Sequence, residues 1–315
     1  MNVLVTGASG FVGSKLLERL DLSLVKTLGR DLPDNFPRSQ HFEKEIDSTT
    51  DYSDALYKVD TIVHLAARVH VMEDAAEDPL EAYREVNTYG TINLARQAVK
   101  AGVKRFVFIS SIKVNGESTS DEKPFSYNDA HSPEDFYGQS KSEAELALFS
   151  LSKETGIEVV VIRPTLVYGP GVKANFASLM SLVQKGIPLP FGCISDNRRS
   201  LVSVRNLVDL IDTCLTHTNA ANQVFLVSDD RDVSTTGMVS EMASALERKT
   251  LQIPVPKWVF RLIGKISGKQ NIVDRLLGSL SVDISHTKKT LDWKPIQTLE
   301  EGFKETADAL NKVKN

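Results

Sequence analysis

The sequence predicts an α/β fold built on a doubly wound parallel sheet. Short apolar runs rich in β-branched residues alternate along the chain with longer segments of helical periodicity, the pattern of repeated βαβ units. The first run also ends in three glycines spaced three residues apart, Gly7, Gly10 and Gly13, which predicts a strand, a tight turn and the start of a helix. We therefore expect a central sheet with helices on both faces.

The glycine loop is the first element that indicates a ligand. Gly7 and Gly10 allow positive φ and a close approach of backbone N–H groups to a pyrophosphate, and Gly13 allows the helix to pack closely on the sheet. The spacing differs from the usual G-x-G-x-x-G fingerprint, and glycines that merely permit a turn are the alternative. Because a strand precedes the loop and a helical pattern follows it, we interpret it as the dinucleotide site of a Rossmann domain.

The remaining elements follow in chain order. We expect strands at residues 3–5, 24–28, 61–65, 106–109 and 159–162, and helices at 14–20, 80–101 and 140–155. Residues 201–204 and 224–227 are predicted to return to the sheet, with a helix at 206–216 between them and helices from Ser234 onward. The predicted Rossmann domain thus comprises residues 1–167 and 201–228. A smaller, discontinuous substrate-binding lobe comprises 168–200 and 229–315.

Residues 258–266 form an amphipathic pattern with Arg261 and Lys265 on one side, which is typical of a helix on a membrane surface. Gly264 and Gly268 weaken a free helix, so we expect a helix packed in the smaller lobe.

Composition excludes several classes of protein. The 315 residues are 41% hydrophobic and 25% charged, which are ordinary globular values. A net charge of −4 without a basic cluster argues against nucleic-acid binding, and the six histidines and two cysteines show no metal-ligand spacing. No apolar run approaches the length of a membrane span. We expect a soluble cytoplasmic protein that binds no metal and does not insert into membranes.

Tyr137 and Lys141 stand four residues apart in a predicted helix and therefore on one face. An ammonium below the phenol favours the charged form of Tyr137, which makes it a proton donor and acceptor near neutrality. An exposed helical pair would look the same. Together with the glycine loop, however, the pair predicts a nicotinamide-dependent oxidoreductase.

Six ordered motifs carry a resemblance to a known family. They are Val63-His-Leu-Ala-Ala67, Val86-Asn-Thr-Tyr-Gly-Thr91, Phe108-Ile-Ser-Ser111, Tyr137-x-x-x-Lys141, Arg163-Pro-Thr-Leu-Val-Tyr-Gly-Pro-Gly171 and Arg199-Ser-Leu-Val-Ser-Val204. Over nearly its whole length the chain resembles extended short-chain dehydrogenases/reductases of the NAD-dependent epimerase/dehydratase family.

The resemblance implies a catalytic Ser-Tyr-Lys set. Tyr137 is the acid/base, Lys141 binds the nicotinamide ribose and tunes Tyr137, and Ser111 hydrogen-bonds the reacting oxygen. Ser110 is the competing candidate for this last role. We favour Ser111 because it fits the family's Ser/Thr-x-x-Val-x-Gly pattern, which ends here at Gly116.

Cofactor choice depends on the end of the second strand, where an acidic residue favours NAD and an arginine favours NADP. Placing the strand at 25–28 puts Gly29 and Arg30 there and favours NADP(H), whereas counting without a gap puts Asp31 there and keeps NAD(H) possible. Asp47 resembles an aspartate that touches the adenine, with a turn-capping role as the alternative. The residues expected to bind the cofactor are Gly7, Ser9, Gly10, Phe11, Val12, Gly13, Arg30, Asp47, Leu65, Ala66, Ala67, Asn87, Tyr137, Lys141 and Pro164.

The resemblance also implies four substrate-binding residues. Arg199 matches an arginine that grips the nucleotide diphosphate, and Asn175 and Arg275 resemble the asparagine and second arginine of that site. Lys113 either faces the sugar or a phosphate or is a solvated loop lysine. Ile112 and Lys113 replace the Asp-Glu pair of the family's 4,6-dehydratases, which argues against dehydration.

The nearest resemblance is to bacterial 4-reductases for UDP-2-acetamido-2,6-dideoxy-4-ketohexoses of O-antigen synthesis, often labelled UDP-glucose 4-epimerases. Epimerases often show Val-Tyr-Gly where this chain has Val114-Asn-Gly116, which predicts an altered sugar pocket. The expected activity is therefore NAD(P)H-dependent reduction of a UDP-4-keto-6-deoxy-HexNAc at C4. The alternative is a UDP-hexose 4-epimerase, for UDP-glucose or UDP-GlcNAc, with tightly bound NAD.

A nucleotide-sensing binding protein is a third possibility, which the intact Ser111, Tyr137 and Lys141 disfavour. Family resemblance further suggests a homodimer through the helices at 80–101 and 140–155.

Overall fold

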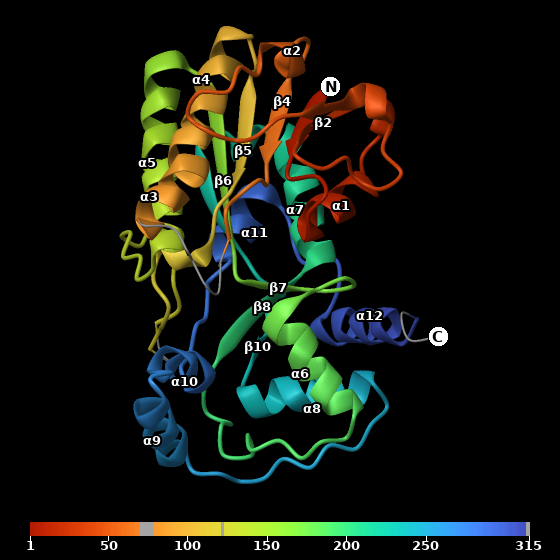
Figure 1. Ribbon diagram of the computed structural model, residues 1–315, viewed down its shortest axis with the longest axis vertical. Coiled ribbons are helices and arrows are strands. Elements are labelled where there is room, and N and C mark those ends of the chain that lie inside the picture. Colours follow the sequence, from red (N-terminus) through yellow and green to blue (C-terminus); the bar gives the residue numbers. More distant parts are fainter. Residues whose placement is uncertain (70–77, 121–122, 313–315) are drawn as a thin grey trace.

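A computed structural model describes residues 1–69, 78–120 and 123–312, and its main feature is a seven-stranded parallel sheet of order β3-β2-β1-β4-β5-β6-β9 (Figure 1). The strands are β1 Val3–Thr6, β2 Val25–Gly29, β3 His41–Glu43, β4 Thr61–His64, β5 Arg105–Ile109, β6 Glu158–Pro164 and β9 Gln223–Val227. The strand order reverses between β1 and β4, as in a Rossmann fold. The predicted fold class is confirmed.

Helices cover both faces of this sheet (Figure 1). On one face lie α2 Ser53–Leu56, α3 Pro79–Arg84, α4 Thr91–Lys100 and α5 Phe136–Thr155, and on the other α1 Phe11–Leu17, α7 Val204–Thr216 and α11 Ser285–Leu291. Side chains alternate between the faces, so that Val5 packs in the core with α1 and α7 while neighbouring Leu4 packs in the core with α4 and α5. Short helical segments are η1 Leu22–Leu24, η2 Arg38–Gln40, η3 Glu85–Gly90, η4 Ile112–Val114 and η5 Thr218–Ala220.

Two predicted helices differ in detail from the observed ones. The helix expected at 80–101 contains a π-helical turn, η3, between α3 and α4. The helix expected at 140–155 begins at Phe136, because the Asp135 carboxylate accepts a hydrogen bond of 2.7 Å from the Gly138 N–H and caps the first turn. This earlier start places Tyr137 inside the first turn of α5.

A second, three-stranded sheet of order β10-β8-β7 lies beyond the carboxyl edge of the first (Figure 1). Its strands are β7 Leu166–Tyr168, β8 Arg199–Ser203 and β10 Asp232–Val233, and helices α6 Ala174–Gln184, α8 Thr235–Ala245 and α12 Leu299–Lys312 pack on it around a core of its own. Tyr168, Phe176 and Phe303 form the aromatic centre of that core.

The prediction that residues 201–204 return to the large sheet is wrong. Strand β9 occupies the edge beside β6, and β8 pairs instead with β7 and β10. The Asp229 carboxylate, just after β9, accepts a hydrogen bond from the Ser203 N–H at 2.8 Å and fixes the end of β8 beside that strand. The division of the chain into two lobes at the predicted boundaries stays a prediction.

Helices α9 Lys257–Ser267 and α10 Gln270–Leu277 form a hairpin at the end of the molecule away from α2 (Figure 1). Gly264 lets them approach closely, since a Cβ there would lie 2.7 Å from a Val273 methyl. As expected, α9 is a packed helix, with Phe260 on the cluster of Ile194 and Val273, but it buries one side only: Trp258 is 63% exposed and Ile266 79%.

Within the described ranges, no helix combines the length and the apolar composition that crossing a bilayer requires.

Gly13→Ala should destabilise the glycine loop between β1 and α1. A Cβ at this position would lie 2.3 Å from the Gly7 carbonyl oxygen and 2.6 Å from the Ala8 Cα, and backbone cannot yield as a side chain does. We expect the free energy of unfolding to fall by about 1–3 kcal/mol in urea titrations. Gly29→Ala is the control, because its Cβ would meet nothing within 4 Å. Equal stability of the two variants would contradict this prediction.

Candidate active site

The glycine loop joins the carboxyl end of β1 to α1. Gly7 has a φ of 67°, and a Cβ on it would lie 2.7 Å from the Ala66 nitrogen, so the loops after β1 and β4 touch. Helix α1 begins after Gly10 without a side-chain cap and without an acidic residue in its first turn. The loop residues Ser9 and Gly10 are exposed. This backbone leaves N–H groups at the helix start available to an anion.

A buried chain of hydrogen bonds fixes the loop after β4. The Thr6 hydroxyl accepts a bond from the Ala66 N–H at 3.1 Å and bonds His64 Nδ1 at 2.7 Å, while His64 Nε2 bonds the Thr91 hydroxyl at 2.9 Å. Burial lowers the pKa of His64 to about 3, with a smaller contribution from Lys141, so the imidazole is neutral. The chain positions Leu65, Ala66 and Ala67. Sequence reasoning missed His64, although it stands inside the quoted motif at 63–67.

The three predicted catalytic residues gather at the carboxyl end of β5. The Lys141 ammonium donates to the Ile109 carbonyl at 2.9 Å and lies 4.4 Å from the centroid of the Phe108 ring. The start of α5 abuts η4, because a Cβ on Gly138 would lie 2.7 Å from the Lys113 carbonyl oxygen. Ser111, immediately before η4, therefore lies beside the first turn of α5 that carries Tyr137.

The two serines after β5 have different surroundings. Ser110 is buried and donates a hydrogen bond to Glu145. Ser111 is partly exposed, and its hydroxyl accepts a long bond of 3.3 Å from the Lys113 N–H. Of these two serines, Ser111 is thus the one whose hydroxyl remains accessible to a ligand.

Burial is the largest influence on the pKa of Tyr137, and the tuning of this residue by Lys141 stays a prediction. Burial raises the pKa of Tyr137 above its usual value, and Asp135 and Tyr83 raise it further. Burial also lowers the pKa of Lys141 to about 7, because a charged ammonium loses its hydration there. The helical spacing predicts that the two residues share one face of α5 but not the loss of water around both.

A buried ion pair lies directly beneath these residues. Arg163 Nη2 and Glu145 Oε2 are 2.5 Å apart, and the two side chains are 2% and 0% exposed. The remaining donors of Arg163 bond Asn115 Oδ1 at 2.9 Å and His131 Nε2 at 2.6 Å. Each of the three guanidinium nitrogens thereby has a partner, and the group ties β6 to α5 and to the loop after β5.

The other predicted cofactor residues have diverse partners. Asn87 is buried, and its amide bonds the Arg68 backbone and the Ser140 hydroxyl at 2.8–3.0 Å, so it supports the loop after β4. Asp47 caps a turn by accepting the Thr49 and Thr50 N–H groups at 2.8 and 2.6 Å. Arg30 is exposed just after β2.

Three further residues that were predicted to bind the cofactor, Phe11, Val12 and Pro164, are buried or half-buried near the glycine loop. Pro164 ends β6 and is buried, and a Cβ on Gly171, after β7, would lie 3.9 Å from the half-buried ring of Phe11. Val12 is half-buried beside Phe11 at the start of α1.

Three of the predicted substrate residues, Lys113, Arg199 and Arg275, lie around Glu117, an acidic residue that the sequence analysis did not single out. Arg275 donates to both oxygens of Glu117 at 2.7 and 2.8 Å, and Lys113 donates to the same carboxylate at 2.9 Å. Arg199 donates to the Arg275 carbonyl at 2.7 Å. Although burial acts in the opposite direction, Arg275 and Lys113 lower the pKa of Glu117 to about 2. Lys113 also pairs with Asp135, so it is not a solvated loop lysine.

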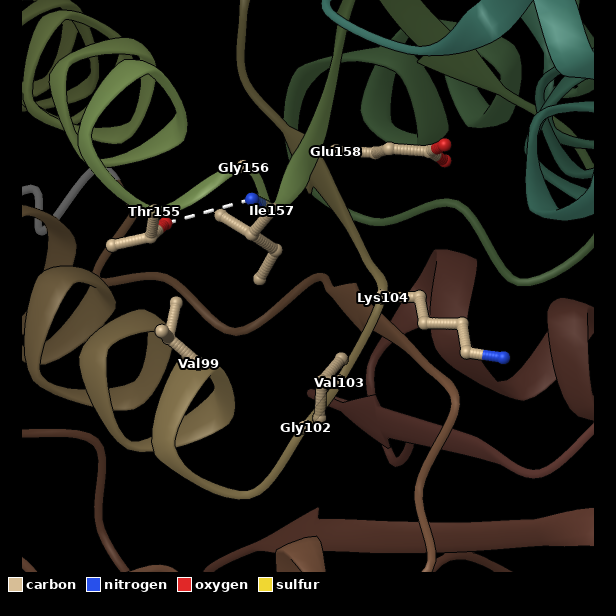
Figure 2. A pocket seen from close by; sticks show the side chains of 8 residues that line it. All are labelled: Val99, Gly102, Val103, Lys104, Thr155, Gly156, Ile157 and Glu158. Carbon is tan, nitrogen blue, oxygen red and sulfur yellow. Dashed lines mark hydrogen bonds between the residues drawn. The ribbon is translucent and has the colours of Figure 1, made fainter.

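Asn175, the fourth substrate residue, belongs to α6, and its side chain lies outside the part of the chain that the structure describes. A hollow of about 420 Å³ lies elsewhere, at the amino ends of β5 and β6 and so at the opposite edge of the sheet (Figure 2). Its lining residues are Val99, Gly102, Val103, Lys104, Thr155, Gly156, Ile157 and Glu158.

The lowered pKa of Lys141 predicts a pH dependence of stability. Between about pH 7 and pH 10.5 the unfolded chain holds the lysine proton while the folded protein has lost it, so the free energy of unfolding rises with pH through this window. The gain is roughly 5 kcal/mol at most, at about 1.4 kcal/mol per pKa unit. Lys141→Met should lack this gain in urea titrations at pH 7 and pH 9.5. Parallel pH profiles of the two proteins would refute the assignment.

Comparison with known proteins gives the family. Over 317 residues the chain is 58% identical to a UDP-glucose 4-epimerase of Vibrio cholerae, covering 100% of this chain and 97% of the relative. It is 31% identical over 290 residues to the N-acetyl-alpha-D-glucosaminyl-diphospho-ditrans,octacis-undecaprenol 4-epimerase of Escherichia coli O157:H7, covering 86% of this chain and 82% of the relative.

Solved structures share the fold at low identity. A UDP-glucose 4-epimerase from Thermotoga maritima with UDP-glucose superposes with a TM-score of 0.77 at 22% identity, covering 100% of both chains. A UDP-glucuronic acid 4-epimerase from Bacillus cereus with NAD gives 0.79 at 20% identity, again over 100% of both chains.

The family model for the NAD dependent epimerase/dehydratase family matches residues 3–228. NAD(H) fits this family, and the predicted preference for NADP(H) is not supported. The match spans the glycine loop, the carboxyl edge of the sheet and Arg163. The chain therefore belongs to the NAD dependent epimerase/dehydratase family and is an NAD-dependent enzyme.

Proposed function

We propose that this protein is a UDP-sugar 4-epimerase that works with tightly bound NAD. The observation that carries the proposal is the 58% identity, along the full chain, to a protein named UDP-glucose 4-epimerase. The reductase that we expected from the sequence has no comparable support. One reason for expecting it also disappears, since Asn115 is buried against Arg163 and so does not reshape a sugar pocket.

The nucleotide loop fits the proposed cofactor. The backbone at Gly7 and Gly13 is packed too closely to admit a Cβ, so the loop lies close against the start of α1. The first turn of that helix contains no carboxylate that would compete with a phosphate for its N–H groups. Arg30 and Asp31 both follow β2 and are exposed. We assign Asp31 to the adenosine ribose hydroxyls, in agreement with NAD. When bound, NAD supplies reversible hydride transfer at C4 of the sugar.

In the proposed mechanism Tyr137 moves the proton and Ser111 orients the oxygen. Tyr137 takes the proton of the 4-hydroxyl as the hydride leaves C4. After the 4-keto sugar has turned over, Tyr137 returns the proton to the same oxygen as C4 regains the hydride on its opposite face. Ser111 donates to the oxygen in both directions. Since burial raises the pKa of Tyr137, deprotonation of the phenol requires positive charge nearby, which a protonated Lys141 provides once ligands occupy the site.

The diphosphate of the substrate is assigned to Arg199 and Arg275. Both guanidinium groups lie in the cluster around Glu117, close to the segment that begins with Ser111. Glu117 occupies the Nε and Nη2 edge of Arg275, so a diphosphate that leaves this ion pair intact engages the Nη1 side of the guanidinium. Lys113 is held by Glu117 and by Asp135.

Tyr137→Phe keeps the ring and removes the proton donor. We expect epimerisation to slow by about 10²-fold or more, while UDP and NAD still bind. Tyr83→Phe is the matched control, because it removes the same hydroxyl from a ring whose centroid lies 6.4 Å from that of Tyr137. Rates are measured with UDP-glucose and with UDP-GlcNAc. A Tyr137→Phe rate within a few-fold of wild type would exclude the proposed role.

Cofactor retention separates the epimerase from the reductase. An epimerase restores its cofactor in every cycle, so purified protein should retain about one NAD per chain and should interconvert UDP-glucose and UDP-galactose, or UDP-GlcNAc and UDP-GalNAc, without added reductant. Cofactor content is measured after acid release, and products by chromatography. A protein without bound NAD that consumes added NAD(P)H only with a UDP-4-keto-6-deoxy sugar would instead establish the reductase.

A further inference from the structure

The α9–α10 hairpin presents an apolar stripe that nothing in the described chain covers. Trp258, Leu262 and Ile266 recur every four residues and are 63%, 49% and 79% exposed, and Ile263 beside them is 57% exposed. This stripe lies opposite Gly264, the residue through which α9 packs on α10. Scattered exposed apolar residues are normal on a protein surface, but four on one face of an 11-residue helix form a contiguous patch.

Further apolar side chains are exposed on α10 and in the segment that precedes α9. Ile272 on α10 is 61% exposed. Leu251 and Ile253 are 64% and 43% exposed, in a segment that leads towards α9 and pairs with Leu189.

Basic side chains border this patch. Residues 247–269 contain six basic residues and one acidic residue, a net charge of +5, which leaves −9 on the rest of a chain whose total is −4. Arg261 and Lys265 lie on the flank of α9 between its apolar stripe and its packed side, and with Lys269 they are exposed and, among the described residues, form no ion pair. Four of the six basic residues, Lys257, Arg261, Lys265 and Lys269, lie on α9 or directly after it.

We propose that the α9–α10 hairpin docks on the surface of an anionic lipid bilayer. An apolar stripe with tryptophan at one end and lysine and arginine along its flank has the composition of helices that lie in the headgroup region. The positive charge favours anionic over neutral lipid, and it opposes the stacking of two such patches from two copies of the chain. The helix is too short to cross the bilayer, in agreement with the lack of a spanning helix in the described ranges.

Docking would place the candidate substrate site at the membrane. Arg275 belongs to α10, and its side chain reaches Glu117 while its carbonyl accepts from Arg199. The hairpin is therefore at once the proposed docking element and one wall of the substrate cluster. This inference does not depend on the chemistry of the reaction.

The positions of the two tryptophans provide a direct test. Trp293 is 6% exposed and donates to Asp209 at 2.7 Å, so Trp258 is the residue whose emission responds to lipid. Full-length protein is mixed with vesicles of phosphatidylcholine and phosphatidylglycerol, or of phosphatidylcholine alone, and followed by tryptophan emission and by flotation. We expect a blue shift and flotation with the mixed vesicles, and no blue shift in Trp258→Phe.

Variants separate the apolar and the electrostatic contributions to docking. Leu262→Ser with Ile266→Ser should lower vesicle partitioning by at least about tenfold, and Arg261→Gln with Lys265→Gln by about fivefold per charge. Ile296→Ser is the matched control, as exposed as Leu262 at 49% but outside the hairpin, and should bind as wild type does. Thermal melts verify folding.

Two outcomes would overturn the proposal. The first is no binding of wild type to the anionic vesicles at physiological ionic strength, or binding that the Leu262/Ile266 variant retains. The second is a concentration-dependent Trp258 shift without lipid, accompanied by dimerisation that this variant abolishes, since the patch would then be an interface between two copies. Neither outcome depends on whether the protein has epimerase activity in solution.

Discussion

The buried ion pair between Glu145 and Arg163 is the interaction on which the candidate site depends. Tyr137, Lys141 and Glu145 follow one another at four-residue intervals on one face of α5. Glu145 fixes that face to β6 through Arg163 and to the end of β5 through Ser110, and Lys141 adds a bond to the Ile109 carbonyl. Removing one partner would leave a buried charge, at a cost of about 3–5 kcal/mol. The position of Tyr137 relative to Ser111 follows from this anchoring.

The substrate cluster is assembled differently, from segments far apart in the chain. Thr119 pairs with Ser279, Arg199 with Leu280 and Phe125 with Val282, so a short extended segment at 279–282 lies between the loop after β5 and the smaller sheet. This segment brings Glu117 to Arg275 and Arg199 to the carbonyl of Arg275. The site therefore joins the two sheets through backbone pairing as well as through charge.

The sequence predicts the large sheet well because its signals are local. Apolar runs mark β1, β2, β4, β5 and β6, and the glycine loop marks the turn after β1. It does not predict that β8 joins the smaller sheet, because a strand with four consecutive buried residues would look the same in either sheet. Nor does it predict Glu117, whose partners stand up to 158 positions away. The pKa values of Tyr137 and Lys141 depend on lost hydration, which helical spacing does not contain.

The chain of hydrogen bonds from Thr91 through His64 to Thr6 has a consequence for acid tolerance. With a pKa near 3, His64 keeps one charge state and one pattern of donors and acceptors from mildly acidic to alkaline solution. The loop after β4 is therefore held in place by a histidine that does not titrate under physiological conditions. Acidification in that range leaves this chain of hydrogen bonds, and with it the loop after β4, unchanged.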